Sequence, residues 1–517
     1  MKSLPHFQCK NGVPQFLVNE EPVLLLSGQL HNSSSSSEEY MKAVWPKLKA
    51  MHMNTVIATA SWELIEPEPG TFTFESVDHL IEQARRYGLK LLIIWFASWK
   101  NGSSTYIPAW AKRDRKTYFR CRTADGRVTG TISPLCKACV EADARAFSRL
   151  MRHLKEIDGE EQTVLAMQVE NESGFYGGDF DWSEPSVKAF SEPVPEELIQ
   201  YLNRASLVSP LAEHYTQNGA SWEAAFGEMA HECFMAYHFA KSIGYVAARG
   251  KEEYPLPMYA NIWPMQYPGE FAALRPCGGP DSSVYPIWKQ AAPALDALAP
   301  DLYEENFVEE CARYKQGGTN PLIISELRYD RWAPAMVLYA LSQGALLVSP
   351  FGIDDIDRRP EKQVPDMVQG VHQTMSPHDS TDFLKKLYAQ LGGLEKTMIA
   401  AAQRGDLFGV MQGNLVQEGL NMGEYHLRVT FPRIAEPQRY PGALMVIREA
   451  EGSFILVGFS VQLEFFSKKG RQIEWISLDE GSFETGRWVP GRRLNGDELR
   501  LDMGEEVTVW RLSLESF

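Results

Sequence analysis

The sequence lacks the features that mark membrane proteins and disulfide-stabilised domains. Its longest apolar stretches, such as Leu91–Ala97, are far too short to cross a bilayer as a helix. Cysteine is scarce, and seven residues scattered over 517 positions do not form the pattern of a disulfide framework. Residues 1–15 contain no apolar core of a signal peptide. These absences predict a protein without a membrane partner in a reducing cytoplasm.

An excess of basic charge and a glycine-rich phosphate loop are lacking as well. The formal net charge is −16, which excludes a sequence-independent nucleic-acid binder, because such a protein needs a basic footprint. The first apolar run continues into SGQLHNSSSSSEEY and not into a G-x-G-x-x-G turn, which argues against a dinucleotide-binding fold. The pair Cys136 and Cys139 has no second pair and no histidine set nearby. We therefore expect no metal site and no cofactor.

Short apolar runs alternate with amphipathic helical segments over the first four hundred residues. Helices are expected, for example, at 38–53, 140–157 and 332–343. Runs that are apolar on both faces and separated by helices predict an α/β fold, a closed (β/α)8 TIM barrel, with an open doubly wound sheet as the alternative. The eight predicted strands are 23–30, 54–62, 90–97, 164–172, 257–263, 299–303, 321–327 and 345–350.

The pattern changes near residue 400, after the last helical stretch. Short β-like segments separated by Gly, Asn, Pro and Asp then continue to the C-terminus. We predict a catalytic barrel with an N-terminal lead-in and long loops at 1–395, and a β-sandwich-like accessory domain at 396–517. No Gly/Ser-rich or Pro-rich linker separates the two, so they are expected to contact each other. The five serines at 33–37 predict an exposed loop after the first strand.

Two carboxylates stand at the ends of strongly apolar strands, Glu172 in QVENE and Glu326 in LIISEL. Barrel enzymes carry their chemistry at the C-terminal ends of the strands, and burying a carboxylate there without a purpose is costly. The fourth and seventh strands lie on opposite sides of the mouth, so the two groups can approach to the roughly 5–5.5 Å that retaining glycosidases use. Asn171, beside the acid, is expected to bond the 2-hydroxyl of the sugar.

Other polar and aromatic residues at the strand ends form a predicted sugar-binding set. For each tryptophan, packing in the core or rim is an equal alternative to stacking on a sugar ring. Glu170 is interpreted as a structural barrel residue, and Glu63 as a capping or solvated one. The predicted set consists of Trp62, Ser98, Trp99, Asn101, Asn261 and Trp332.

Four segments carry a resemblance to a known family: NGVPQFLVNEEPVLLLSGQLHNSS near the start, WELIEPEPGTFTFE at 62–75, QVENESG at 168–174 and PLIISELR at 321–328. Over most of residues 10–355 the chain resembles glycoside hydrolase family 35, the β-galactosidase family of clan A, and within it a bacterial subgroup with a β-rich C-terminal domain. The resemblance implies a retaining exo-acting β-glycosidase, most simply a β-galactosidase. It also implies Glu172 as acid/base, Glu326 as nucleophile, and Tyr303 as a residue that orients the nucleophile.

One segment departs from the family pattern. Typical members carry Cys-Ala-Glu-Trp after the third strand, and its Glu binds sugar hydroxyls, whereas residues 96–101 here read FASWKN. A β-glucoside-directed hydrolase or a transglycosylase, for example on β-1,2-glucans, is therefore the alternative enzyme. The non-enzymatic alternative is a carbohydrate-binding protein on a decayed barrel, against which the intact Glu pair argues. Each of these alternatives has an oligosaccharide or a glycoside as its binding partner. The sequence leaves the oligomeric state open, and a homo-oligomer is one of the alternatives.

Overall fold

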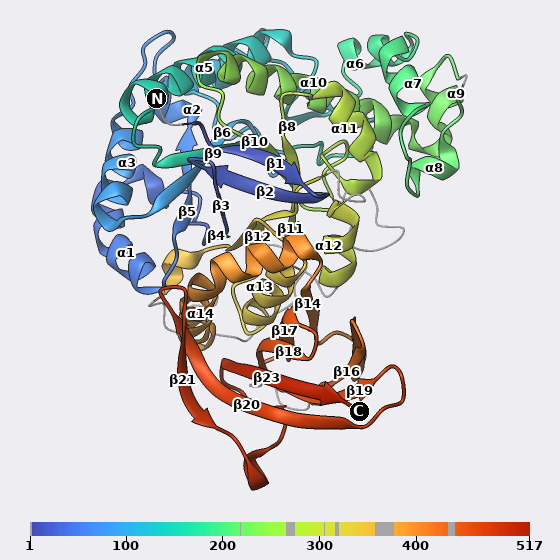
Figure 1. Ribbon diagram of the computed structural model, residues 1–517. Helices are drawn as coiled ribbons and strands as arrows, with labels where there is room; N and C mark the ends of the chain where they lie inside the picture. The colour runs from blue at the N-terminus through green and yellow to red at the C-terminus, as the bar shows by residue number, and fades with distance from the viewer. Residues whose placement is uncertain are drawn as a thin grey trace.

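The structure is a computed structural model that describes residues 3–217, 219–264, 275–303, 306–315, 320–356, 377–432 and 440–517. Its larger part is one eight-stranded parallel sheet surrounded by helices (Figure 1). This observation confirms the predicted (β/α)8 fold class and the eight predicted strands. In sheet order the strands are β4 (Leu25–Leu26), β13 (Leu347–Pro350), β12 (Ile323–Leu327), β11 (Ala297–Leu302), β10 (Met258–Ile262), β9 (Val164–Asn171), β6 (Lys90–Lys100) and β5 (Thr55–Ser61).

The segment after β4 closes the sheet into a barrel. Gln29 forms parallel bridges to Ile57 of β5 on one side and to Phe351 after β13 on the other. An open doubly wound sheet is excluded, because its two edge strands would be unpaired. The first strand is shorter than predicted, since the predicted run 23–30 begins inside another strand, β3 (Glu21–Val23).

Apart from α13, which is described below, helices around the barrel bury the face that their apolar spacing predicts. In α3, for example, Val77, Leu80 and Ile81 are buried, and the helix ends where Gly88 adopts a left-handed conformation, φ 63°. The main helices are α1 (Glu38–Ala50), α3 (Glu75–Tyr87), α5 (Lys137–Asp158), α10 (Ala230–Glu253), α11 (Tyr285–Ala291), α12 (Phe307–Lys315), α13 (Ala333–Ser342) and α14 (Pro377–Arg404). In the described part of the chain, no helix has the length and hydropathy that crossing a bilayer requires.

Insertions lengthen several connections of the barrel. The predicted excursion between β9 and α10 consists of short helices, and a two-stranded ribbon follows β6. A three-stranded antiparallel sheet precedes β4, and its Phe16 packs with Leu25, Ile57 and Leu92 in a core cluster formed by the barrel strands. The additional elements are β1 (His6–Lys10), β2 (Val13–Val18), α2 (Trp62–Ile65), α4 (Ala109–Arg113), β7 (Arg120–Arg122), β8 (Val128–Ile132), α6 (Glu184–Phe190), α7 (Glu196–Leu202), α8 (Leu211–His214) and α9 (Trp222–Phe226).

The C-terminal part is all-β, as predicted, and consists of two antiparallel sheets. The six-stranded sheet packs one face against the four-stranded sheet and the other against helices α13 and α14, which separate it from the barrel (Figure 1). This position explains why α13 is buried on all sides. The strands are β14 (Leu407–Met411), β15 (Gln417–Met422), β16 (Tyr425–Thr430), β17 (Ala443–Ala450), β18 (Ser453–Phe459), β19 (Val461–Ser467), β20 (Ile473–Glu484), β21 (Arg487–Arg493), β22 (Asp502–Met503) and β23 (Thr508–Ser516).

The predicted contact between the barrel and the β-rich part is present. Ile447 and Phe483 from the six-stranded sheet share one core cluster with Leu387 and Leu391 of α14. The predicted boundary at residue 396 lies within α14, and the division into two domains stays a prediction.

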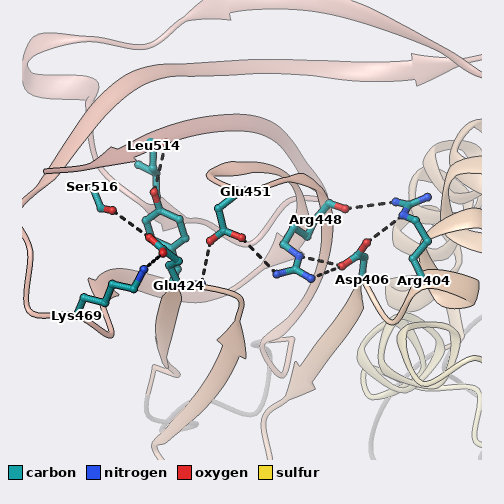
Figure 2. A network of polar contacts seen from close by, with 9 residues as sticks. Arg404, Asp406, Glu424, Arg448, Glu451, Lys469, Leu514 and Ser516 are labelled. Carbon is teal, nitrogen blue, oxygen red and sulfur yellow. Dashed lines mark hydrogen bonds and ion pairs between the residues drawn. The ribbon is translucent and has the colours of Figure 1, made fainter.

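A series of ion pairs ties the end of α14 to the β-rich part (Figure 2). The guanidinium group of Arg448 donates to Asp406 at 2.6 and 2.8 Å, and Arg404 donates to the other oxygen of Asp406 at 2.9 Å. Glu451 lies 3.6 Å from Arg448 and accepts a hydrogen bond from the amide of Glu424 at 2.8 Å. Although burial opposes it, hydrogen bonds from the two arginines lower the pKa of Asp406.

Candidate active site

Three buried carboxyl groups meet at the C-terminal ends of the barrel strands. Glu172 follows β9 directly, Glu326 is the last residue but one of β12, and Asp301 lies in β11. The two glutamates are 4% exposed and Asp301 is 0% exposed. One oxygen from each of the three groups lies within 4.8 Å of the others. The sequence predicted the two glutamates at this place and missed the aspartate.

Both carboxyl oxygens of Glu326 accept hydrogen bonds. Gln29 Nε2 donates to Oε1 at 2.7 Å, and the hydroxyl group of Tyr303 donates to Oε2 at 2.8 Å. Gln29 reaches Glu326 because the closing bridges of the barrel place it between β5 and β13. Two donors on separate oxygens fix the carboxyl plane of Glu326, and Tyr303 lies where the resemblance implied.

The surroundings of Glu172 favour its protonated form. Burial and the charge of Glu326 raise the pKa of Glu172 to about 7, whereas the charge of Lys100 and hydrogen bonds from Asp301 and Asn101 oppose this rise. The backbone of Glu172 is left-handed, φ 43°, which is uncommon outside glycine. Its amide donates to Asn261 Oδ1 at 3.0 Å, which helps to hold this conformation.

A network of side-chain amides connects the predicted asparagines to the carboxyl groups. Asn261 Nδ2 donates to Asn171 Oδ1 at 3.1 Å and to Asp301 Oδ2 at 2.6 Å. Gln168 also donates to Asn171, at 2.9 Å, and Asn171 in turn donates to Asn101 at 3.4 Å. The structure therefore brings Asn101, Asn171 and Asn261 together beside the carboxyl groups.

Three other predicted sugar-binding residues lie inside the barrel wall. Trp62, Ser98 and Trp99 have exposed fractions of 0%. The Ser98 hydroxyl donates to Asp143 of α5 at 2.5 Å, and the indole of Trp99 donates to a backbone carbonyl at 3.0 Å. The indole of Trp62 donates to Glu66 at 2.8 Å. Their polar groups are thus engaged by Asp143, Glu66 and a backbone carbonyl and not by the three carboxyl groups of the site. A contact of these three residues with sugar stays a prediction.

Trp332 lies between strand β12 and helix α13. It is the N-cap of α13, half-buried, and packs against the main core cluster. Its amide donates to Asp330 at 2.8 Å. This placement matches the packing alternative for Trp332 and leaves its contact with sugar a prediction.

Glu170 belongs to a second buried carboxyl pair behind the site. It accepts hydrogen bonds from the amides of Ser98 and Trp99 at 2.9 and 2.8 Å, which matches its interpretation as a structural residue. Burial and the neighbouring Asp143 raise the pKa of Glu170 well above its ordinary value. Glu63, in contrast, is 38% exposed and pairs with Lys112 at 3.0 Å, as a solvated residue does.

The three carboxyl groups also have a geometry that can hold a metal ion, since each offers one oxygen within 4.8 Å of the others. Oxygen ligands of this kind suit hard divalent cations. The expectation that the site works without a metal therefore stays a prediction. The pair Cys136 and Cys139 is buried, and both residues are free cysteines.

The sequence signal for Asp301 and Gln29 is their position at the ends of apolar runs. Asp301 closes the apolar run ALAPDL, just as Glu172 and Glu326 close theirs, and Gln29 stands at the end of VLLLSGQL. Each is a polar residue at the C-terminal end of a predicted barrel strand, which is the position where barrels carry functional groups.

Comparison with known proteins agrees with this geometry. Residues 15–241 match the sequence model described as "Glycosyl hydrolases family 35", and residues 384–503 match a domain of unknown function, DUF5597. A β-galactosidase from Xanthomonas manihotis is 30% identical over 172 residues, which are 32% of this chain and 26% of that protein. A β-galactosidase from Canis lupus familiaris is 24% identical over 195 residues, which are 36% of this chain and 27% of that protein. The matches thus span about a quarter of these relatives' length.

A solved structure supports the fold. The β-galactosidase from Bacillus circulans sp. alkalophilus superposes with a TM-score of 0.50 and 15% identity, and the match covers 73% of this chain and 57% of that one. The residues that the family model matches include Glu172, which directly follows strand β9. The resemblance to glycoside hydrolase family 35 that the motifs predicted is therefore confirmed, and residues 15–241 carry it.

Proposed function

We propose that this chain is a retaining, exo-acting β-glycosidase in which Glu172 is the general acid/base and Glu326 is the nucleophile. The observation that carries the proposal is the separation of the two groups, whose oxygens lie within 4.8 Å of each other. Retaining enzymes hold their carboxyl groups roughly 5–5.5 Å apart, whereas inverting enzymes need about 6.5–9.5 Å to admit a water molecule. The short separation supports retention.

The surroundings of each glutamate suit its proposed role. Glu326 attacks the anomeric carbon while Glu172 gives its proton to the leaving oxygen, and the glycosidic bond breaks. Glu172, now ionised, takes a proton from water, which attacks the anomeric carbon and releases Glu326. Tyr303 and Gln29 orient Glu326 for the first step. Burial and the charge of Glu326 raise the pKa of Glu172 to about 7, so that it carries its proton below about pH 7.

A β-galactoside is the first proposed substrate, because the two relatives described above are β-galactosidases. Exo action is proposed because the resemblance to the family implies it. One observation favours the alternative, a β-glucoside-directed hydrolase or transglycosylase. Ser98 stands where typical members carry the sugar-binding Glu, and its hydroxyl group is engaged by Asp143 at 2.5 Å. No carboxylate at this position is therefore offered to the sugar.

A panel of chromogenic β-galactosides, β-glucosides and β-1,2-linked glucans tests both proposals. Hydrolysis of the β-galactoside alone supports the first, and turnover or glycosyl transfer with glucosides or glucans supports the second. Release of single sugars from the non-reducing end of an oligosaccharide tests exo action. If wild-type protein neither hydrolyses nor transfers any of them, the non-enzymatic alternative, a carbohydrate-binding protein, replaces the proposal.

We also propose the reducing cytoplasm as the location. All seven cysteines are free in the structure, and six of them are buried. Mass spectrometry after alkylation of the protein in unbroken cells tests this, because disulfides in the native protein would contradict it.

A further inference from the structure

Lys100 brings a positive charge to the strand ends that carry the carboxyl groups. It is the last residue of β6, is half-buried, and pairs in register with Asn171, which directly precedes Glu172. Among the residues that the structure describes, its ammonium group forms no hydrogen bond and no ion pair. An ammonium group has three donors and no acceptor. These donors therefore face water or a ligand and not another part of the protein.

An irregularity in the barrel wall determines where Lys100 lies. Strand β6 advances five positions over residues 95–100, while the neighbouring β9 advances only two over residues 169–171. The carboxyl group of Glu170 accepts hydrogen bonds from the three consecutive amides of residues 97–99, at distances of 2.8, 2.9 and 3.3 Å. These amides are satisfied by a side chain and not by the backbone of β9. Pairing between the two strands resumes at Lys100, beside the acid.

The ammonium group of Lys100 lies over an aromatic ring of the barrel interior. Its Nζ is 5.3 Å from the centroid of the Phe96 ring, and Phe96 is 0% exposed. Phe96 belongs with Ile57 to the core cluster formed by the barrel strands, whereas the hydroxyl group of Ser98 bonds Asp143 of α5. A cation is attracted to the face of an aromatic ring. Lys100 is thus held on the side of the sheet where the barrel interior lies.

The charge of Lys100 also acts on the carboxyl groups of the site. Burial raises the pKa of Glu172 and that of Asp301, and the positive charge of Lys100 opposes this rise in both. No carboxylate of the described residues, however, lies within ion-pair distance of its ammonium group. Lys100 therefore shares the space in front of the carboxyl groups without being held by them.

We propose that Lys100 is a substrate-binding residue that determines specificity, and that its ammonium group donates hydrogen bonds to hydroxyl oxygens of the terminal sugar. This inference rests on the proposed function, because Glu172 and Glu326 place the anomeric carbon of that sugar. In an exo-acting enzyme the terminal sugar fills the depth of the pocket, and the leaving group points to solvent. A donor that lies on the buried ring of Phe96 therefore meets the terminal sugar.

The charges of the site indicate the class of sugar. Three carboxyl groups and one ammonium group disfavour a sugar acid, because its carboxylate would add a further negative charge. Lys100 then discriminates among neutral sugars by the positions of their hydroxyl groups, since a site that bonds a hydroxyl group rejects the analogue that lacks it. With Asn171 expected at the 2-hydroxyl, Lys100 binds the 3-, 4- or 6-hydroxyl of a neutral hexoside.

Removal of single hydroxyl groups from the substrate tests this contact. An aryl β-glycoside that the wild type hydrolyses is compared with its 3-, 4- and 6-deoxy analogues. With the wild type, at least one analogue should lose about 10–150-fold in kcat/KM, because a hydrogen bond to a charged group is lost. With Lys100→Met, the same analogue should react nearly as well as the parent glycoside. Lys112→Met, which removes an ammonium group paired with Glu63 at 3.0 Å, is the matched control and should show the wild-type pattern.

A role of Lys100 in charge balance alone would give a different result. Lys100→Met would then lower kcat/KM for the parent and for every analogue by the same factor, and this outcome would overturn the proposal. Coupling between Lys100 and hydroxyl groups of the leaving group alone would overturn it as well. The wild-type series decides even if the variant does not fold, because a wild type that tolerates the loss of each of the three hydroxyl groups contradicts the contact.

Calorimetry with free galactose and free glucose separates this proposal from the proposed function, because binding needs no turnover. Lys100→Met should bind the preferred sugar at least about tenfold more weakly than the wild type, and Lys100→Gln, which keeps a neutral donor, should lie between them. If the sugar binds in this way but no glycoside is hydrolysed or transferred, the proposed function fails and the contact stands. Equal affinities of the wild type and Lys100→Met would overturn the contact. If the wild type binds neither sugar and acts on no glycoside, both proposals fail.

Discussion

The proton on Glu172 should control how activity changes with pH. The rise of its pKa from an ordinary 4.5 to about 7 corresponds to about 3 kcal/mol against the ionised form in this site. Because the acid must be protonated to donate, kcat/KM for a poor leaving group should fall about tenfold for each pH unit above about 7. Glu172→Gln should remove this alkaline limb.

The loss in Glu172→Gln should depend on the leaving group. For an unactivated β-glycoside, removing the general acid should lower kcat/KM by about 10²–10⁴-fold. A dinitrophenolate needs no proton, so its glycosylation step should be largely spared and the glycosyl-enzyme should accumulate. Azide, which needs no base, should release it as the β-glycosyl azide, whereas azide with a Glu326→Gly variant should give the α-azide. Stopped-flow release of dinitrophenol and NMR of the products measure both.

Glu63→Gln is the matched control, because Glu63 is a half-exposed carboxylate paired with Lys112 near the same strand ends. It should keep the alkaline limb and the leaving-group pattern of the wild type. Retention of the limb in Glu172→Gln would refute the reasoning and identify another acid, with Asp301 as the nearest candidate. If the Glu172 variant gave the α-azide and the Glu326 variant the β-azide, the assignment of acid/base and nucleophile to Glu172 and Glu326 would have to be reversed.

Three further outcomes follow from single contacts. Tyr303→Phe removes the 2.8 Å hydrogen bond to Glu326, and a bond to a charged group is worth about 1.5–3 kcal/mol, so kcat/KM should fall roughly 10–150-fold; an unchanged value would contradict this role. Arg448→Met breaks the ion pair with Asp406 (Figure 2). This substitution should lower the free energy of unfolding by about 1–2 kcal/mol, as measured in thermal or urea melts. Arg127→Met is the control, because the Arg127 ion pair is exposed, and it should change the free energy of unfolding by less than about 0.5 kcal/mol. Prolonged chelation should leave glycosidase activity unchanged, and a loss that a divalent cation restores would show that the carboxyl groups hold a metal.

The environment of a residue depends on partners far away in the chain, which local sequence patterns do not show. The five-serine run predicted an exposed loop, yet Ser34 and Ser35 are buried. Ser34 donates to Asp354 at 2.6 Å, and no pattern near residue 34 shows that a partner 320 positions away will satisfy its hydroxyl group. The same holds for Ser98, which bonds Asp143 of a neighbouring helix.

Local patterns predicted the strands well, and they predicted that Glu172 and Glu326 lie together at the strand ends, whereas the catalytic roles of the two residues stay a prediction. The eight apolar runs of strand length form the eight barrel strands. A strand that is apolar on both faces must be covered on both faces, and the wall of a barrel surrounded by helices provides that cover. Glu172 and Glu326 were identifiable because burying a carboxylate at the end of an apolar run costs free energy, so that such a residue indicates a function. The prediction was weakest for the first strand. Only Leu25–Leu26 form a regular strand there, and isolated bridges of Gln29 complete the pairing with the neighbouring strands.

The sequence by itself determined the barrel, the all-β C-terminal part and the identity of the two glutamates, because apolar periodicity and strand-end carboxylates are local properties of the chain. Only the tertiary structure decided which groups surround those glutamates. It brought Gln29 and Tyr303 to Glu326, and it placed Asp301 within 4.8 Å of both carboxylates. Desolvation and charge act through space and not along the chain, so the distribution of protons in the site follows from contacts between residues that are as far as 297 positions apart in the sequence.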